Sequence, residues 1–354
     1  MIVALADALE TDVAIGDLTL ANGHTLPDVV QRVMILGAQP APDGSNVALV
    51  PHALTGSANV ADWWGGIVAA GAPLDLDRWC VVGINALGGW YGSTGPASTA
   101  PDGRVWGPRF PVVTVADMVE AQLRALASLG ITRLAIVAGG SLGGFQTLQW
   151  ARAHSDLVDH ALIVGATDHL RAQALAQNGL AREAIALDPA FAGGWYGDTQ
   201  PAAGLRLARG IATLTYKSEA LFETRFRNRP NRSGGDPTRA LVDGFDVDGY
   251  LALQGDRFAA RVDANAYRTL TRAMDLFDLR DRETPAGTTR LTFVGITGDQ
   301  LFAPEHVWET AERWRAAGWD AVYLEQRSDH GHDAFLAEVE ELALVLAERF
   351  TKNA

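Results

Sequence analysis

A serine held between glycines, in the stretch Gly139-Gly-Ser-Leu-Gly143, constrains this chain more than any other feature. The apolar run Leu134–Val137 before it predicts a buried strand, and Leu142–Ala153 after it predicts a helix. Small residues at a turn from strand to helix leave room for a strained backbone that pushes the Ser141 hydroxyl into a cleft. The setting therefore indicates a nucleophilic serine. In the competing interpretation the stretch is a plain Gly-rich turn and Ser141 only caps the helix. A phosphate-binding loop is a weaker alternative, because its lysine and its glycine spacing are missing.

Apolar runs of strand length recur along the chain and are separated by helical patterns. In Thr114–Leu129 the apolar residues follow helical spacing, Thr114 fits an N-cap and Gly130 fits a stop signal. Continuous apolar strands joined by helices are typical of a mostly parallel sheet with helices on both faces. We therefore predict an α/β fold. Its strands are expected at 47–50, 80–84, 134–137, 160–164, 291–296 and 321–324, with further helices at 304–317 and 333–349.

The pattern changes after Gly165. From about Asp168 to Arg282 the chain reads as helices rich in Arg and Ala, with no convincing strand. Pro and Gly clusters such as Asn228–Gly235 interrupt these helices. The simplest interpretation is a helical cap inserted into an α/β core. We place the first part of the core at 1–167, the cap at 168–285 and the second part of the core at 286–354.

Composition limits the classes of partner. The 354 residues are 48% hydrophobic and 20% charged, so the chain can bury a large core. A net charge of -13 without any block of Lys or Arg argues against a nucleic-acid or anionic-membrane surface. The single cysteine, Cys80, excludes an internal disulfide and a Cys-based zinc site, and we expect it in a buried strand. No other cluster suggests a metal site, so none is predicted.

The sequence also bears on localisation. Met1–Gly16 carries Asp7, Glu10 and Asp12 and lacks a basic leading region, so a secretory signal is not expected. No apolar run approaches the ~20 residues that a helix needs to span a bilayer. We therefore expect a cytoplasmic protein.

A serine nucleophile needs a base that is oriented by an acid, and two later loops supply candidates. The strand predicted at 291–296 leads straight into Asp299, which places this carboxylate at a strand end. The strand predicted at 321–324 leads into a loop with two histidines, His330 and His332. The order serine, acid, histidine is the one that follows a turn of this type. The pattern alone does not choose the base, and it leaves a solvated acidic loop as the alternative. The same loop adds two competing acids, Asp329 and Asp333.

Several longer stretches resemble the homoserine O-acetyltransferase family. They occur in the family's order and extend from roughly Leu18 to Leu336, almost the whole chain. The resemblance implies an α/β-hydrolase fold with an inserted helical cap. The matching stretches are Pro51–Ser57, Gly88–Pro96, Gly139–Gly144, Phe245–Phe258, Asp263–Tyr267 and His330–Leu336.

The resemblance also assigns the catalytic groups. It implies Ser141 as nucleophile, Asp299 as orienting acid and His332, rather than His330, as base. In this type of site the residue after the nucleophile and the loop after the first core strand donate two amides to the oxyanion. We therefore expect the amides of Leu142 and Leu54 in these roles, with a plain turn as the alternative for the second loop.

Three more residues match family positions that hold an amino-acid acceptor. Arg209 and Tyr216 lie seven residues apart, two turns along one helical face, and Asp333 lies beside the base. An acceptor carboxylate would pair with Arg209, and its ammonium with Asp333. The alternatives are a solvated arginine and a tyrosine that only packs. Bulky Trp90 is expected near the acyl or acceptor pocket.

The resemblance implies a ping-pong transfer of an acetyl group from acetyl-CoA to the hydroxyl of L-homoserine, a step of methionine biosynthesis. Acetyl-CoA would be a substrate, and no permanently bound cofactor is expected. The partners would be small molecules and a second copy of the chain in a homodimer. The same machinery also fits a serine O-acetyl- or succinyltransferase or a carboxylester hydrolase. A binding protein with an inactive hydrolase fold is the alternative of a different class.

Overall fold

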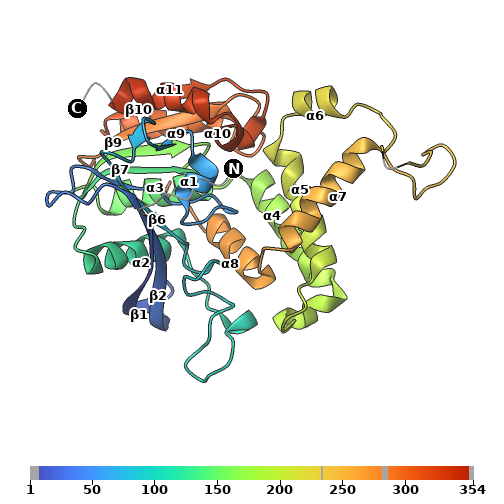
Figure 1. Cartoon of the computed structure of the whole chain (residues 1–354), viewed down its shortest axis with the longest axis horizontal. Helices are drawn as coiled ribbons and strands as arrows, with labels where there is room; N and C mark the ends of the chain where they lie inside the picture. The colour runs from blue at the N-terminus through green and yellow to red at the C-terminus, as the bar shows by residue number, and fades with distance from the viewer. Residues whose placement is uncertain (1–7, 233, 281–285, 351–354) are drawn as a thin grey trace.

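Eight strands form one sheet in the computed structural model, which describes residues 8–232, 234–280 and 286–350 (Figure 1). The order across the sheet is β1-β2-β6-β3-β7-β8-β9-β10. Six neighbouring strands, from β6 to β10, run parallel, while β2 pairs antiparallel with both β1 and β6. The predicted α/β fold with a mostly parallel sheet is confirmed. The strands are β1 Leu9–Thr19, β2 Thr25–Gly37, β3 Val47–Leu49, β6 Cys80–Ile84, β7 Leu134–Gly140, β8 Val158–Val164, β9 Arg290–Ile296 and β10 Ala321–Gln326; β4 Val68–Ala69 and β5 Leu74–Asp75 form a separate small sheet.

Helices cover both faces of the sheet, and this is why its central strands β3, β6 and β7 are apolar throughout. In β8, Leu162 and Val164 join a buried cluster with helices on one face, while Ala161 and Ile163 join the cluster on the other. Cys80 is fully buried in β6, as predicted. Helices α1 Val60–Trp64, α10 Ala334–Ala337 and α11 Val339–Phe350 contribute to the first cluster, and α2 Val115–Ser128, α3 Leu142–Ala153 and α9 Pro304–Ala316 to the second.

Helices α4 to α8 occupy the stretch between β8 and β9. In Figure 1, α4 to α7 lie to one side of the sheet and its covering helices. The two ends of this stretch lie side by side, since His169 and Asp278 form an antiparallel bridge. The chain therefore leaves the core and returns to it at the same place. The domain boundaries at 168 and 285 stay a prediction, and residues 281–285 lie outside the described ones. The helices are α4 Ala172–Leu187, α5 Ala202–Tyr216, α6 Glu219–Arg225, α7 Asp246–Ala259 and α8 Ala264–Asp275.

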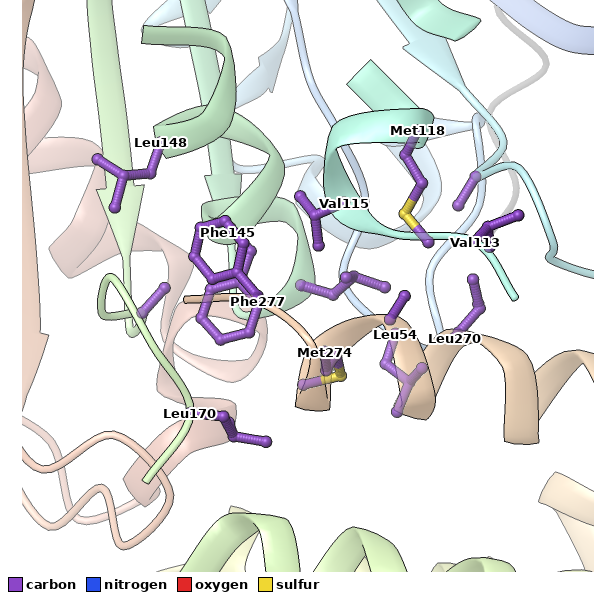
Figure 2. Close-up of a cluster of buried hydrophobic side chains, with 14 of the residues drawn as sticks. Leu54, Val113, Val115, Met118, Phe145, Leu148, Leu170, Leu270, Met274 and Phe277 are labelled. Atoms are coloured by element: carbon purple, nitrogen blue, oxygen red, sulfur yellow. The ribbon is translucent and has the colours of Figure 1, made fainter. Parts of the chain in front are cut away.

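Helix α8 packs on the core rather than projecting from it. Figure 2 shows its Leu270 and Met274 within the same buried cluster as Leu54, which lies in the loop after β3. Phe277, just past α8, stacks on Phe145 of α3 with ring centroids 4.5 Å apart. This apolar packing fixes the loop of Leu54 against the helix that follows Ser141. The neighbouring elements of the active site are therefore held by side chains from three separate parts of the chain.

The hairpin β1–β2 lies outside the predicted strands. Its register shifts twice, between Ala14 and Gly16 and between Gly16 and Leu18. Asp28 in β2 has a positive φ of 49°, which is uncommon for a non-glycine residue. Within the described ranges, no helix has the length and apolar character that crossing a bilayer requires.

Candidate active site

Ser141 lies in the strained turn between β7 and α3, as the sequence predicts. Its backbone has φ 57° and ψ -122°, a conformation that a side-chain-bearing residue adopts only when its surroundings enforce it. Close packing explains the glycines around it. A Cβ on Gly139 would lie 2.5 Å from the carbonyl carbon of Gly143, and one on Gly143 would lie 2.2 Å from the Pro51 oxygen. The turn therefore forms only because these positions carry no side chain.

Asp299 and His332 form a buried pair. Oδ2 of Asp299 lies 2.7 Å from Nδ1 of His332, and the two residues are both 3% exposed. The other carboxylate oxygen, Oδ1, accepts hydrogen bonds from the amides of Leu301 and Phe302, each at 2.8 Å. These two bonds fix the carboxylate, which in turn orients the imidazole with Nε2 away from Asp299. Gly165 packs against the pair: a Cβ there would lie in ordinary contact with the imidazole ring, at 3.4 Å, and its φ of 51° is one that favours glycine.

The surroundings of His332 favour its protonated form. Burial lowers the pKa of its imidazole, but the charge of Asp299, the hydrogen bond that the imidazole donates to Asp299 and the charge of Asp333 together outweigh burial and raise the pKa above 6.5. His330, the competing histidine, has its Nε2 3.6 Å from a carboxylate oxygen of Glu338 and does not reach Asp299. The geometry therefore selects His332 as the partner of the acid.

Ser141 and His332 line the same cavity, which has a volume of about 250 Å³. Among the described residues, no hydrogen bond joins the Ser141 hydroxyl to His332. Such a bond often tightens only when substrate binds. The cavity is lined by Ala53, Leu54, Thr55, Gly56, Trp63, Ser141, Arg209, Tyr216, Arg261, His332, Asp333, Phe335 and Leu336.

The two predicted oxyanion amides belong to segments in close contact. The short approach of Gly143 to Pro51 places the residue after Ser141 against the loop of Leu54. Neither the Leu54 nor the Leu142 amide donates a hydrogen bond to another described residue. Leu54 lines the catalytic cavity, and Leu142 is fully buried. His52 holds this loop: the Ala86 amide donates to its Nε2 at 3.0 Å, so Nδ1 carries the proton that is donated to the Ala53 oxygen at 2.7 Å. Burial lowers the pKa of His52, which keeps the ring neutral.

Arg209 and Tyr216 both face the cavity from α5. The Arg209 guanidinium carbon lies 5.3 Å from the Tyr216 ring centre and 5.6 Å from that of Phe258. Among the described residues, Arg209 has no carboxylate partner. Tyr216 in turn lies 5.6 Å from the His332 ring, and burial raises the pKa of its hydroxyl. The Arg209 guanidinium, without a carboxylate partner among the described residues, therefore lies against the neutral Tyr216 ring in the cavity.

Asp333 also lines the cavity, and it carries a partner that the sequence reasoning missed. Nζ of Lys217 lies 2.9 Å from its Oδ2, with both side chains at most 20% exposed. Lys217 directly follows Tyr216 at the end of α5, so one helix supplies three groups around the base. In the sequence, only the position of Lys217 next to Tyr216 hints that it lies near the site. That position does not indicate its ion pair with Asp333.

A second cavity, of about 730 Å³, adjoins the first and was not predicted. Thr55, Gly56, Trp63 and Arg261 line both. Arg261, which follows α7, is exposed and has no ion-pair partner among the described residues. Trp90 lines this second cavity and does not line the catalytic one. The expectation that Trp90 lies near the acyl or acceptor pocket is therefore correct only for the adjoining space.

The arrangement can carry out acyl transfer. It combines a serine hydroxyl, an imidazole oriented by a buried carboxylate, and two backbone amides. The cavity is also lined by two arginines, Arg209 and Arg261, that have no ion-pair partner among the described residues, and by the carboxylate of Asp333, which pairs with Lys217.

Known proteins share this fold and sequence. Residues 46–339 match the family described as the alpha/beta hydrolase fold. A homoserine O-acetyltransferase of Symbiobacterium thermophilum is 42% identical over 91% of this chain and 88% of its own. A homoserine O-succinyltransferase of Neisseria gonorrhoeae is 40% identical over 91% of this chain and 90% of its own. The crystal structure of a homoserine O-acetyltransferase from Bacillus anthracis superposes with a TM-score of 0.90 at 24% identity, covering 97% of both chains. The chain therefore belongs to the homoserine O-acetyltransferase family of α/β-hydrolase-fold proteins.

Proposed function

We propose that this protein transfers an acetyl group from acetyl-CoA to the hydroxyl of L-homoserine. The observation that carries the proposal is the presence of both a positive and a negative side chain in the catalytic cavity. Arg209 and Asp333 line the same 250 Å³ as Ser141 and His332. A carboxylate and an ammonium on one small molecule need two such groups, whereas water as acceptor needs neither. Relatives at about 40% identity support homoserine as the acceptor: some are homoserine O-acetyltransferases, which supports the same reaction, and others are homoserine O-succinyltransferases.

The first half-reaction acylates the serine. His332 Nε2 takes the proton of the Ser141 hydroxyl while Oγ attacks the thioester carbonyl carbon. The carbonyl oxygen becomes an oxyanion that the amides of Leu54 and Leu142 stabilise. When the C–S bond breaks, the CoA sulfur leaves with the proton from His332, and an acetyl ester remains on Ser141.

The second half-reaction reverses these roles. The homoserine carboxylate binds Arg209, and its ammonium binds Asp333, where it shares the carboxylate with Lys217. His332 takes the proton of the homoserine hydroxyl, whose oxygen attacks the acetyl carbonyl. The bond to Ser141 Oγ then breaks, the proton returns to the serine, and O-acetyl-homoserine leaves.

The adjoining cavity supports a route for the donor. It opens onto the catalytic cavity along Thr55, Gly56 and Trp63, and its 730 Å³ is large enough for the chain that carries a thioester. Arg261 lines both cavities and has no ion-pair partner in the part of the chain that the structure describes. We assign it to the phosphate groups or polar arm of CoA, with the acetyl group pointing to Ser141.

A comparison of donors and acceptors tests the proposal. The protein is incubated with acetyl-CoA or succinyl-CoA, each alone, with L-homoserine or with L-serine, and free CoA thiol is measured over time. We expect fast release only with acetyl-CoA and homoserine together. Thiol release that homoserine does not accelerate would contradict transfer and indicate an esterase. Faster release with succinyl-CoA or with serine would assign the chain to a sister transferase.

We also propose that the protein works as a homodimer in the cytoplasm, with no metal or resident cofactor. The exposed face of α5 supports a second copy as its partner. Leu207 and Leu214 on this helix are 58% and 54% exposed and lie seven residues apart, with half-buried Ile211 between them. A stripe of this spacing is an apolar surface of the kind that a protein interface covers.

A further inference from the structure

A third cavity, of about 400 Å³, lies where α4 and α8 meet the loop 107–112. It shares no lining residue with the catalytic cavity or with the adjoining one. One wall is apolar and consists of Pro108, Phe110, Pro111 and Val112. The acyl-transfer mechanism uses none of these residues.

The other wall carries three arginines. Arg182 comes from α4, and Arg268 and Arg272 come from α8, one turn apart. Two carboxylates oppose these three charges: Asp275, which pairs with Arg182 and lies 3.9 Å from Arg272, and exposed Glu183 on the rim. Three positive and two negative charges leave a local excess of one positive charge.

Two hydrogen-bond donors of this wall are not paired with any other group in the part of the chain that the structure describes. Nη1 of Arg182 and Nε of Arg268 are buried and have no hydrogen-bond partner among the described residues. Leaving such donors unpaired costs free energy, more so when the group is charged. Arg268 instead rests on the Phe191 ring, 4.6 Å from its centre. Burial and the charges of Arg182 and Arg272 lower its pKa, although the nearby Tyr196 raises it.

We propose that this cavity binds a small organic anion, in which a phosphate or carboxylate group carries an apolar body. The anionic group would bind Arg268 and Arg272, whose charges Asp275 only partly balances. The apolar body would lie on Phe110 and the prolines beside it. The volume exceeds what an inorganic ion needs and is in the range of small-molecule sites.

Because of where the cavity lies, a bound ligand would bridge separate segments of the chain. Helix α4 belongs to the helices between β8 and β9, whereas the loop 107–112 precedes α2 of the core. A ligand that binds Arg268 and Arg272 and packs on Phe110 would join α8 to this loop, beside Arg182 of α4 and at a point away from Ser141. It would stabilise the folded chain in proportion to its concentration.

Calorimetric titration of the full chain tests the site. The probes are phenyl phosphate and benzoate, which combine an anion with a ring, and inorganic phosphate and phenol, which supply one part each. We expect one of the two combined probes to bind more tightly than either part. Its preference for phosphate or carboxylate identifies the anionic group. The readout is binding alone, so it does not depend on the proposed acyl transfer.

Matched variants locate the bound probe. Arg268→Gln and Arg272→Gln should each weaken binding about tenfold or more, as loss of a charge-assisted hydrogen bond does. Arg272 is 52% exposed, so its variant keeps the test valid if Arg268→Gln fails to fold. Arg290→Gln, at an exposed arginine on β9, should bind like the parent. The proposal would be overturned if no probe bound, if both α8 variants bound as tightly as the parent, or if Arg209→Ala lost binding instead.

Discussion

At the scale of single residues, Asp299 determines the pH at which His332 can act as a base. The imidazole must be neutral to accept the serine proton, and its pKa lies above 6.5 because the charge and hydrogen bond of Asp299, with the charge of Asp333, outweigh burial. Activity should therefore fall as the pH drops through this raised pKa. The measurement is the pH profile of kcat/KM for acetyl-CoA.

Asp299→Asn removes the charge that raises this pKa. Its acidic limb should move to lower pH, and its turnover should fall by about 10³–10⁴-fold because the imidazole loses its orientation. An unchanged limb in this variant would contradict the role of Asp299. The variant should keep the parent's thermal stability closely enough for both profiles to be measured at one temperature.

Arg209 should separate acceptor binding from acylation. In Arg209→Ala the KM for homoserine should rise about 10- to 100-fold, since a charge-assisted contact is lost. Acetylation of Ser141 in the absence of homoserine should keep its rate. Arg206→Ala is the matched control, because Arg206 lies on the same helix and pairs with exposed Asp256. Equal loss of both half-reactions in Arg209→Ala would show a structural role.

At the scale of elements, the turn after β7 depends on the absence of side chains. Gly143→Ala should destabilise the fold and abolish activity, because its Cβ would lie 2.2 Å from the Pro51 oxygen. Gly179→Ala in α4 is the opposite case: nothing lies within 4 Å of its Cβ position. This control should gain about 0.5–1 kcal/mol from helix propensity. Thermal melts of both variants check the pair, and a stable, active Gly143→Ala protein would contradict the packing described.

The core strands were predictable because burial gives each of them an apolar run, although β8, β9 and β10 also contain polar residues. The hairpin β1–β2 was not, because its strands are exposed along one side and its pattern is interrupted at Pro27 and Asp28. The helix expected at 333–349 is in fact broken: a 3-10 turn at Gly331–Asp333 is followed by α10, and α11 begins only at Val339. That turn places His332, and periodicity does not indicate it.

The parts of the site that were predictable are those formed by residues close together in the sequence. The turn of Ser141 and the strand end at Asp299 follow from local pattern. The choice of His332 over His330 came from family resemblance, and the 2.7 Å contact with Asp299 now supports it. Lys217 and Arg261 were missed because their roles depend on which segments meet across the cavity, and that is set by tertiary packing.

At the scale of the whole molecule, the apolar face of α5 predicts self-association. Leu214→Arg should shift the mass measured by light scattering from that of a dimer toward that of a monomer, since a buried unpaired charge opposes association. Leu344→Arg is the matched control, because Leu344 is 69% exposed on α11 of the core. A parent protein that is monomeric at micromolar concentration would contradict the proposed homodimer.

The most direct test of the account is to isolate the acyl-enzyme. The protein is mixed with acetyl-CoA alone, quenched in acid and digested, and the peptide that contains Ser141 is examined by mass spectrometry. The account predicts one acetyl group on Ser141, its absence in Ser141→Ala, and its rapid loss when homoserine is added before the quench. An unmodified Ser141 in a protein that still makes O-acetyl-homoserine would contradict it.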